Sequence, residues 1–352
     1  MDDARVLYEV GQLPIFQNRM YDSEAEAKAC PRGDVCLVED LDSGLVYNAA
    51  FHPELMVYDA NYQNEQAFSP LFQQHLESAT QIVGRSLGRD GLVEVGCGKG
   101  YFLEMLQGMG FDVAGFDPTY EGTNPRIERR YFEPGVGITA SGLILRHVLE
   151  HIPDPVSFLR RLRDANGGSG LIYIEVPCFE WICSHRAWFD IFYEHVNYFR
   201  LTDFYRMFDN VVESGRFFGG QYLYVVADLA SLTTPKYDSR DRIAFPQDFL
   251  CRLEGRSIAG DGKTAIWGGA SKGVIFALLS SRIRSNVDIV IDINPAKQGK
   301  YLPGSGLLVD SPEDGLSKLP NGSTIFVMNS NYLDEIVAQS GNIFSYRTVD
   351  DE

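Results

Sequence analysis

The sequence has little of two things that would each define a class of protein. Its 352 residues contain only 6 cysteines, too few for a scaffold held by disulfides and more typical of a reducing compartment. Basic residues are also outnumbered, with 31 Lys and Arg against 48 Asp and Glu and a net charge of −17. That balance argues against a nucleic-acid partner and against binding to an anionic membrane surface.

Long hydrophobic runs are lacking as well. No stretch reaches about 18 apolar residues, so no membrane span is predicted. Residues 1–12 are acidic and polar, unlike a secretory signal peptide. We therefore expect a cytoplasmic protein, and its length predicts two or three domains with ordinary hydrophobic cores.

The cysteine spacing does not favour a metal site. Cys30 and Cys36 are separated by five residues, and Cys178 and Cys183 by four. Structural zinc sites use C-x2-C pairs, and neither of these pairs has that spacing. No metal ligand is predicted from the sequence.

The strongest local pattern lies in residues 91–118. An apolar strand over 92–95 is followed by a G-x-G-x-G loop, a helix over 101–107 and a second strand over 111–116. Glycines in such a loop let the backbone approach a nucleoside ligand without a Cβ clash. The loop glycines, predicted to bind a cofactor, are Gly96, Gly98 and Gly100.

Two acids beside this loop indicate which cofactor it suits. Asp117, at the end of the second strand, is placed to accept both ribose hydroxyls. Glu94, inside the first strand, would repel a pyrophosphate but suits the cationic groups of S-adenosylmethionine (SAM). The motif E-V-G-C-G-x-G resembles the first motif of class I SAM methyltransferases. An NAD site or a glycine turn without ligand remains an alternative.

The chain continues as a doubly wound sheet requires, with a strand over 143–145, a helix, and a strand over 171–176. In such a sheet the loop after the first of these strands lies over the cofactor. Arg146 and His147 are therefore predicted to bind SAM. The same loop also carries Glu150 and His151.

A second strand–glycine–helix unit occurs over residues 264–292. Its loop, Gly268 to Gly273, and the acid Asp292 form a weak variant of a dinucleotide fingerprint. The predicted fold class is α/β, with two Rossmann-like units. The predicted domains are a small irregular lid (1–75), a SAM-binding domain (76–245) and a C-terminal Rossmann-like domain (246–352).

At this point the chain resembles, nearly end to end, the three-domain C-methyltransferases that act on keto-deoxysugar nucleotides in antibiotic pathways. The resemblance is carried by VEVGCGKGYFLEML, RHVLEHIPDP, IFYEHVNYF, IWGGASKG, DINPAKQGKYLPG and NSNYLDEI. It implies SAM in the middle domain, S-adenosylhomocysteine (SAH) as product, and a small-molecule acceptor between the middle and C-terminal domains. The family's catalytic base falls on His195, its second active-site His on His151, and the motif Glu on Glu194.

The chain departs from that family at two places. Phe192 stands where the family motif usually has Tyr, and Tyr193 follows one residue later. The two C-x2-C zinc pairs of the family's N-terminal domain have no counterpart, since Asp40 and Ser43 occupy likely positions of the second pair. The zinc is therefore expected to be lost. The altered N-terminal domain also means that the family's acceptor, a keto-sugar nucleotide, is not assigned to this chain by the resemblance alone.

The mechanism expected from these residues is methylation at a carbon made nucleophilic by loss of a proton. His195 would be the general base, His151 and Tyr193 would donate to the enolate, and Glu194 would fix the tautomer of a neighbouring His. The alternative for His195 is a core His bonded to Tyr193 or Tyr198. Two alternative functions are O- or N-methylation of a small molecule and a non-enzymatic nucleotide-binding module. The sequence predicts no particular oligomeric state.

Overall fold

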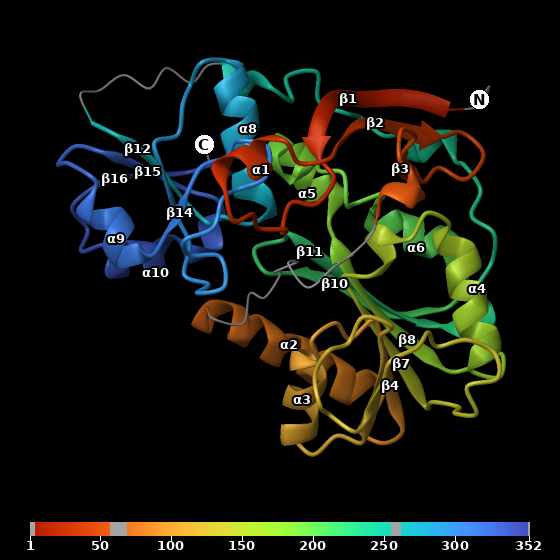
Figure 1. The fold of residues 1–352 in the computed structure, drawn as a ribbon. Helices are drawn as coiled ribbons and strands as arrows, with labels where there is room; N and C mark the ends of the chain where they lie inside the picture. The colour runs from red at the N-terminus through yellow and green to blue at the C-terminus, as the bar shows by residue number, and fades with distance from the viewer. Residues whose placement is uncertain (1–3, 57–68, 255–261, 351–352) are drawn as a thin grey trace.

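The computed structural model describes residues 4–56, 69–254 and 262–350 (Figure 1). Within these residues the strands form three sheets of seven, five and four strands. The two larger sheets are the Rossmann-like units that the sequence predicts. No helix among the described residues is long and apolar enough to cross a membrane.

The seven-stranded sheet has the order β10-β11-β8-β7-β4-β5-β6. Its first five strands in chain order are parallel, while β11 runs antiparallel to both β8 and β10. Parallel strands covered on both faces read as continuous apolar runs, which is why the sequence identifies them. The bounds are β4 (Leu92–Val95), β5 (Val113–Phe116), β6 (Ile127–Glu128), β7 (Gly142–Arg146), β8 (Leu171–Pro177), β10 (Val211–Phe217) and β11 (Tyr222–Asp228).

Helices flank this sheet, and side-chain caps fix where two of them begin. The hydroxyl of Ser69 accepts from the amide of Phe72 at the start of α2, and Asp154 accepts from Ser157 at the start of α4. In both helices a proline follows the cap, at a position that needs no amide donor. The helices of this part are α2 (Pro70–Ser86), α3 (Tyr101–Gly108), α4 (Pro155–Ala165), α5 (Phe179–Ser184) and α6 (Leu201–Met207).

The C-terminal sheet, coloured blue in Figure 1, is entirely parallel and has the order β14-β13-β12-β15-β16. Its strands β12 and β13 lie within the strand–glycine–helix unit that the sequence predicts over residues 264–292. The strands are β12 (Thr264–Trp267), β13 (Ile289–Ile291), β14 (Val309–Asp310), β15 (Thr324–Val327) and β16 (Ser345–Thr348), with helices α7 (Cys251–Glu254), α8 (Ser271–Arg282), α9 (Pro312–Ser317) and α10 (Leu333–Gln339).

The N-terminal part is a regular antiparallel sheet, which corrects the prediction of an irregular segment. It has the order β1-β2-β3-β9 and includes the short helix α1 (Glu24–Lys28). Register shifts between Val6 and Tyr8 and between Val10 and Leu13 interrupt the pairing of β1 with β2. Each shift breaks the alternation of apolar and polar residues, so the sequence gives no clean strand signal. The strands are β1 (Ala4–Pro14), β2 (Arg32–Asp40), β3 (Val46–Asn48) and β9 (Asn197–Tyr198).

The last strand of this sheet comes from the middle of the chain. β9 pairs with β3 two residues after His195. The amide of Asn48 also donates to the carbonyl of Val196, 2.7 Å away. The N-terminal sheet therefore holds the backbone that follows the predicted catalytic His.

The N-terminal segment also reaches the C-terminal sheet. The main chains of Tyr21 and Tyr301 exchange two hydrogen bonds, of 3.2 and 2.9 Å, and the amide of Gly304 donates to Ala27. The fold is thus α/β with a class I methyltransferase sheet, as predicted. The predicted domain boundaries at residues 75 and 245 stay predictions, and parts of the predicted lid (1–3 and 57–68) lie outside the described residues.

Candidate functional site

The two glycine loops face one cavity of about 410 Å³. Gly96 and Gly98 from the first loop line it, and Gly268 and Gly273 from the second loop line it too. The carboxyl ends of both parallel sheets therefore open onto a single space, where ligands of such folds bind.

The three glycines of the first loop differ in how much space surrounds them for a ligand. Gly96 has φ 72°, and a Cβ there would lie 2.5 Å from a methyl group of Val148. Gly98 has no side-chain or distant backbone atom within 4 Å of such a Cβ, so its backbone faces open space at the cavity. Gly100 caps α3 with φ 83° and packs against Ile127 instead of lining the cavity. Close ligand approach is thus available at Gly98.

Asp117 lies beside this loop, directly after β5, but outside the cavity lining. Its Oδ2 accepts a hydrogen bond from the amide of Gly98 at 2.8 Å, and its Oδ1 accepts from the amide and hydroxyl of Thr119. Its carboxylate is therefore fixed against the loop at the predicted ribose position.

Glu94 contributes a buried carboxyl group to the cavity. Its side chain is 3% exposed, and among the described residues its Oε2 has no hydrogen-bond partner. Burial raises its pKa to about 7, with the positive charge of Arg146 opposing the rise. An unpartnered acid beside an open glycine backbone fits a cofactor with cationic groups, so these residues suit SAM.

Arg146 lines the cavity but is engaged with Glu175, at the end of β8. Its Nε lies 2.7 Å and one of its terminal nitrogens 3.1 Å from the two carboxylate oxygens. Glu175 also accepts from Nε2 of His75 at 2.8 Å and from the Tyr173 hydroxyl at 2.9 Å. Burial would raise the pKa of Glu175, yet Arg146, His147 and His75 hold it well below its usual range.

His147 bridges two carboxylates at the edge of the cavity. Its Nδ1 lies 3.2 Å from Oε1 of Glu150, and its Nε2 lies 3.1 Å from Oε1 of Glu175. Burial alone would lower its pKa, but these two carboxylates outweigh burial and raise it to about 9. His147 is therefore an imidazolium ion near neutral pH, held in a left-handed backbone conformation with φ 50°.

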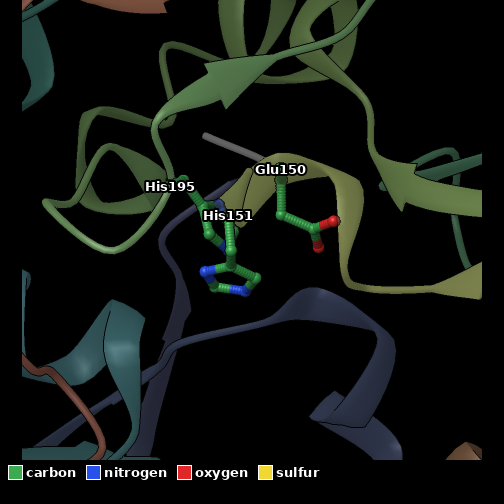
Figure 2. Close-up of side chains that lie close together, drawn as sticks. All are labelled: Glu150, His151 and His195. Carbon is green, nitrogen blue, oxygen red and sulfur yellow. The ribbon is translucent and has the colours of Figure 1, made fainter. Parts of the chain in front are cut away.

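Three side chains converge where the loop after β7 meets the residues before β9 (Figure 2). Glu150, His151 and His195 all line the cavity, and one potential ligand atom of each lies within 4.8 Å of the others. The two imidazole rings are 4.9 Å apart, centre to centre, and nearly perpendicular. The sequence places these residues in two motifs 45 positions apart, and the structure brings them together.

The tautomer of His151 follows from its hydrogen bond. Its Nδ1 lies 2.8 Å from the main-chain carbonyl of Glu194, which can only accept. The proton is therefore on Nδ1, and Nε2 carries a lone pair. Burial lowers the pKa of His151. Burial also lowers the pKa of His195 well below its usual range, and repulsion from an imidazolium at His147 or His151 acts in the same direction.

The other two predicted catalytic residues have different positions. Glu194 lines the cavity, and its carboxylate accepts from the amide of Gln17 at 3.4 Å. It fixes the tautomer of His151 through its carbonyl, whereas the sequence suggested its side chain. Tyr193 is fully buried outside the cavity, where its hydroxyl accepts from the amide of His52 at 2.8 Å. The prediction that Tyr193 donates to the enolate is therefore corrected, because its ring turns toward the N-terminal sheet.

The alternative prediction, that His195 is a core residue bonded to a neighbouring tyrosine, is not supported by the hydrogen bonds. The Tyr198 hydroxyl donates to the carbonyl of Phe192 at 3.1 Å and makes no bond to His195. The nearest ring is that of Phe192, at 4.0 Å between centres. Among the described residues no hydrogen bond to the His195 imidazole is found, and the side chain is at the cavity wall.

Sequence reasoning missed part of this site. His75 lies in none of the sequence motifs, yet it is buried in α2 and bonded to Glu175. The signal for Glu175 was an acid inside the apolar run LIYIEVP. Lys272, in the first turn of α8, lies 2.9 Å from Oε1 of Gln221 and 3.2 Å from Asp190. The local sequence around Lys272 does not predict this contact, because its partners lie in the other Rossmann-like unit.

Comparisons with known proteins identify the class to which this site belongs. Residues 63–211 match a family described as a methyltransferase domain, and residues 245–348 match one described as a C-methyltransferase C-terminal domain. The chain is a SAM-dependent methyltransferase, and SAM is its cofactor. These matches support a place among the C-methyltransferases. The chain is 25% identical to C-methyltransferase NovU of Streptomyces niveus over 307 residues, which span 75% of this chain and 73% of that protein.

The solved structures to which the chain has some similarity include two described as methyltransferases. The N-methyltransferase NodS from Bradyrhizobium japonicum is 13% identical, with a TM-score of 0.33 over 46% of this chain and 97% of that one. A SAM-dependent methyltransferase from Archaeoglobus fulgidus is 16% identical, with a TM-score of 0.34 over 47% of this chain and all of that one.

Proposed function

We propose that the protein methylates a carbon next to a carbonyl group in a small acceptor, of the keto-sugar nucleotide class or a related biosynthetic intermediate. The observation that carries this proposal is the pair of imidazoles, His151 and His195, in the cavity that the SAM loop also lines. The match of residues 245–348 to a C-methyltransferase domain supports carbon as the atom methylated.

The cofactor would be held by residues at the carboxyl edge of the seven-stranded sheet. Bound SAM supplies a methyl group already activated by the positive sulfur. Glu94 would pair with its cationic amino-acid portion, and the open backbone at Gly98 would admit the nucleoside beside Asp117. Arg146 and His147 would act mainly as the wall of this site, because both are bonded to Glu175.

The proton of the acceptor carbon would be removed by His195. A general base needs a lone pair within hydrogen-bond reach of that proton, and His195 lines the cavity with no described hydrogen-bond partner. His151 carries no proton on its cavity-facing nitrogen while neutral. We therefore assign it to accept or relay a proton, which replaces the donor role expected from the sequence.

The acceptor would lie between the two Rossmann-like units. Ser271 and Lys272, at the start of α8 after the second glycine loop, line the same cavity as His195. A small molecule bound there would reach both imidazoles and the SAM loop. The three-part organisation and the predicted boundaries at residues 75 and 245 belong to this proposal.

Calorimetric titration with SAM and SAH tests the cofactor site first. Asp117→Ala should lose most of the affinity for both ligands, while Asp112→Ala, at a surface ion pair before the opposite end of β5, should keep it. Equal affinities in both variants would contradict the assignment of Asp117.

Acceptor screening with 13C-methyl SAM tests the chemistry. The NMR shift of the labelled methyl separates a C-methyl product from an O- or N-methyl product, and an O- or N-methyl product would overturn the proposal. His195→Asn should slow transfer about 10²–10⁴-fold with SAM affinity retained. His52→Asn, an exposed His on the N-terminal part, is the matched control and should remain active.

A further inference from the structure

We propose that Glu150, His151 and His195 form a binding site for one divalent transition-metal ion of the zinc type. Among the residues that the structure describes, this is the one cluster of three or more His, Cys, Asp or Glu whose donor atoms are close enough for an ion. The cysteines whose spacing was considered for zinc, Cys30 with Cys36 and Cys178 with Cys183, do not form such a cluster.

His151 is already arranged as a ligand. Metal-binding histidines almost always donate their second ring N–H to a carboxylate or a backbone carbonyl, which fixes the ring and the tautomer. The Nδ1 of His151 does this to the Glu194 carbonyl, 2.8 Å away. Its Nε2 lone pair is left for an ion.

Glu150 supplies a carboxylate with one oxygen to spare. Its Oε1 accepts from His147 at 3.2 Å, a contact that orients the carboxylate from behind. Among the described residues Oε2 has no partner, although the side chain is only 1% exposed. A buried carboxylate oxygen without a donor is costly, and a cation at the cavity wall would satisfy it.

His195 completes the set with a small adjustment. Ligand atoms about 2.1 Å from a tetrahedral ion lie about 3.4 Å apart, while the three donors here lie within 4.8 Å of one another. No described hydrogen bond restrains the His195 ring. The His195 ring can therefore turn its donor atom toward the other two ligands.

The donor set determines the kind of ion. Two imidazoles and one carboxylate favour Zn²⁺, Co²⁺ or Fe²⁺ over Mg²⁺ and Ca²⁺, which prefer oxygen ligands. Three protein ligands leave a coordination position open toward the cavity. The site is therefore accessible to a small molecule as well as to an ion.

Metal binding has a consequence that rests on the proposed function of His195. A bound ion occupies the lone pair that proton removal requires, so the loaded protein should not transfer the methyl group. SAM binding at Gly98 and Asp117 involves different residues and should persist. Metal binding itself is measured without acceptor, so its failure is distinguishable from failure of the proposed reaction.

The test uses the full chain freed of metal with a chelator. Calorimetric titration with Zn²⁺ should give one tight site, and Co²⁺ should give visible bands of nitrogen and oxygen coordination. Glu150→Gln, His151→Asn and His195→Asn should each weaken binding about 100-fold or more, given that even supporting residues contribute 10–100-fold. His52→Asn should bind as the wild type does.

Two results would overturn the site. One is a thiolate absorption band with Co²⁺, which would assign the ion to the six free cysteines. The other is unchanged affinity in both Glu150→Gln and His151→Asn while thermal unfolding shows each variant to be folded. Zinc that binds but leaves methyl transfer unaffected would keep the site and overturn the role of His195 as base.

Discussion

Nε2 of His75 and Oε1 of Glu175 are 2.8 Å apart, although 100 residues of chain separate them. Both side chains are buried, and the pair joins α2 to the end of β8 beside the cavity. Burial lowers the pKa of His75, so the histidine is neutral and donates its Nε2 proton to the carboxylate. Glu175 thereby links helix α2, through His75, to the cavity residues Arg146 and His147.

Glu175→Gln should destabilise the protein strongly. The change removes the negative charge that compensates the nearly buried Arg146 and the partly exposed His147 imidazolium. Breaking a buried ion pair from one side costs about 3–5 kcal/mol. Urea denaturation measures the difference. Glu128→Gln, at an exposed pair with Arg130, should cost less than about 1 kcal/mol, and equal losses would contradict a special role for Glu175.

SAM affinity should fall as the pH drops below about 7. The pKa of Glu94 is raised to about 7, so at lower pH its carboxyl group is neutral and no longer attracts a cation. Titration calorimetry from pH 6 to pH 8 measures the change. Glu94→Gln should bind SAM weakly and without this pH dependence, whereas a variant with the wild-type profile would refute the assignment.

The same carboxyl group should make the ligand-free protein less stable at higher pH. Its folded pKa lies above the usual value of 4.5, so its contribution to stability is complete below about pH 4.5 and is lost as the pH rises to about 7. Glu94→Gln should therefore raise the free energy of unfolding at pH 8 by up to about 3 kcal/mol. Near pH 4.5 the two proteins should unfold alike in urea.

Gly273→Ala should disrupt the second glycine loop. A Cβ at this position would lie 1.9 Å from the carbonyl oxygen of Gly268, and backbone cannot yield as a side chain does. We expect a loss of more than about 3 kcal/mol, typical of severe overpacking. Gly108→Ala, at the end of α3 with open space around it, should be neutral or stabilising by up to about 1 kcal/mol. Thermal unfolding of both variants checks the contrast.

Lys272→Met should weaken the contact between the two larger sheets. Asp190 would lose its partner, 3.2 Å from the ammonium nitrogen, inside a largely buried environment. We expect a loss of about 3 kcal/mol. The double variant with Asp190→Asn should recover part of it, because no unpaired carboxylate remains. A double-mutant cycle by chemical denaturation measures that coupling, and additive losses would show that the pair is not coupled.

The longer parallel strands could be predicted because they are short apolar runs, and a glycine loop directly follows β4 and β12. β4 and β12 have the predicted bounds, and the loop after β7 lies at the cavity as expected. The hairpin of β10 and β11 was missed, because in β10 the residues alternate between half-buried and exposed without a strongly apolar face. Its role is to cover the edge of β8, which depends on tertiary pairing.

The arrangement of the candidate catalytic groups was less predictable. The motif suggested that Glu194 acts through its side chain, but a main-chain carbonyl is what holds His151. Tyr193 turns away because β9 must pair with β3, and the turn before β9 packs the phenol ring against Gly33. Side-chain direction in such a turn follows from the register of a distant strand, and local sequence does not encode it.

The hydrogen bonds between Tyr21 and Tyr301 have a consequence for how the protein is made. During synthesis, a ribosome releases the first strands long before β9 exists, and the partners of residues 21–27 emerge only near the end of translation. The N-terminal sheet therefore stays incomplete, with β3 as an unpaired edge strand, until about 150 further residues have been added and β9 can pair with it. A nascent chain stalled before residue 197 should be bound by chaperones that protect exposed strands, and release should follow once that strand has emerged.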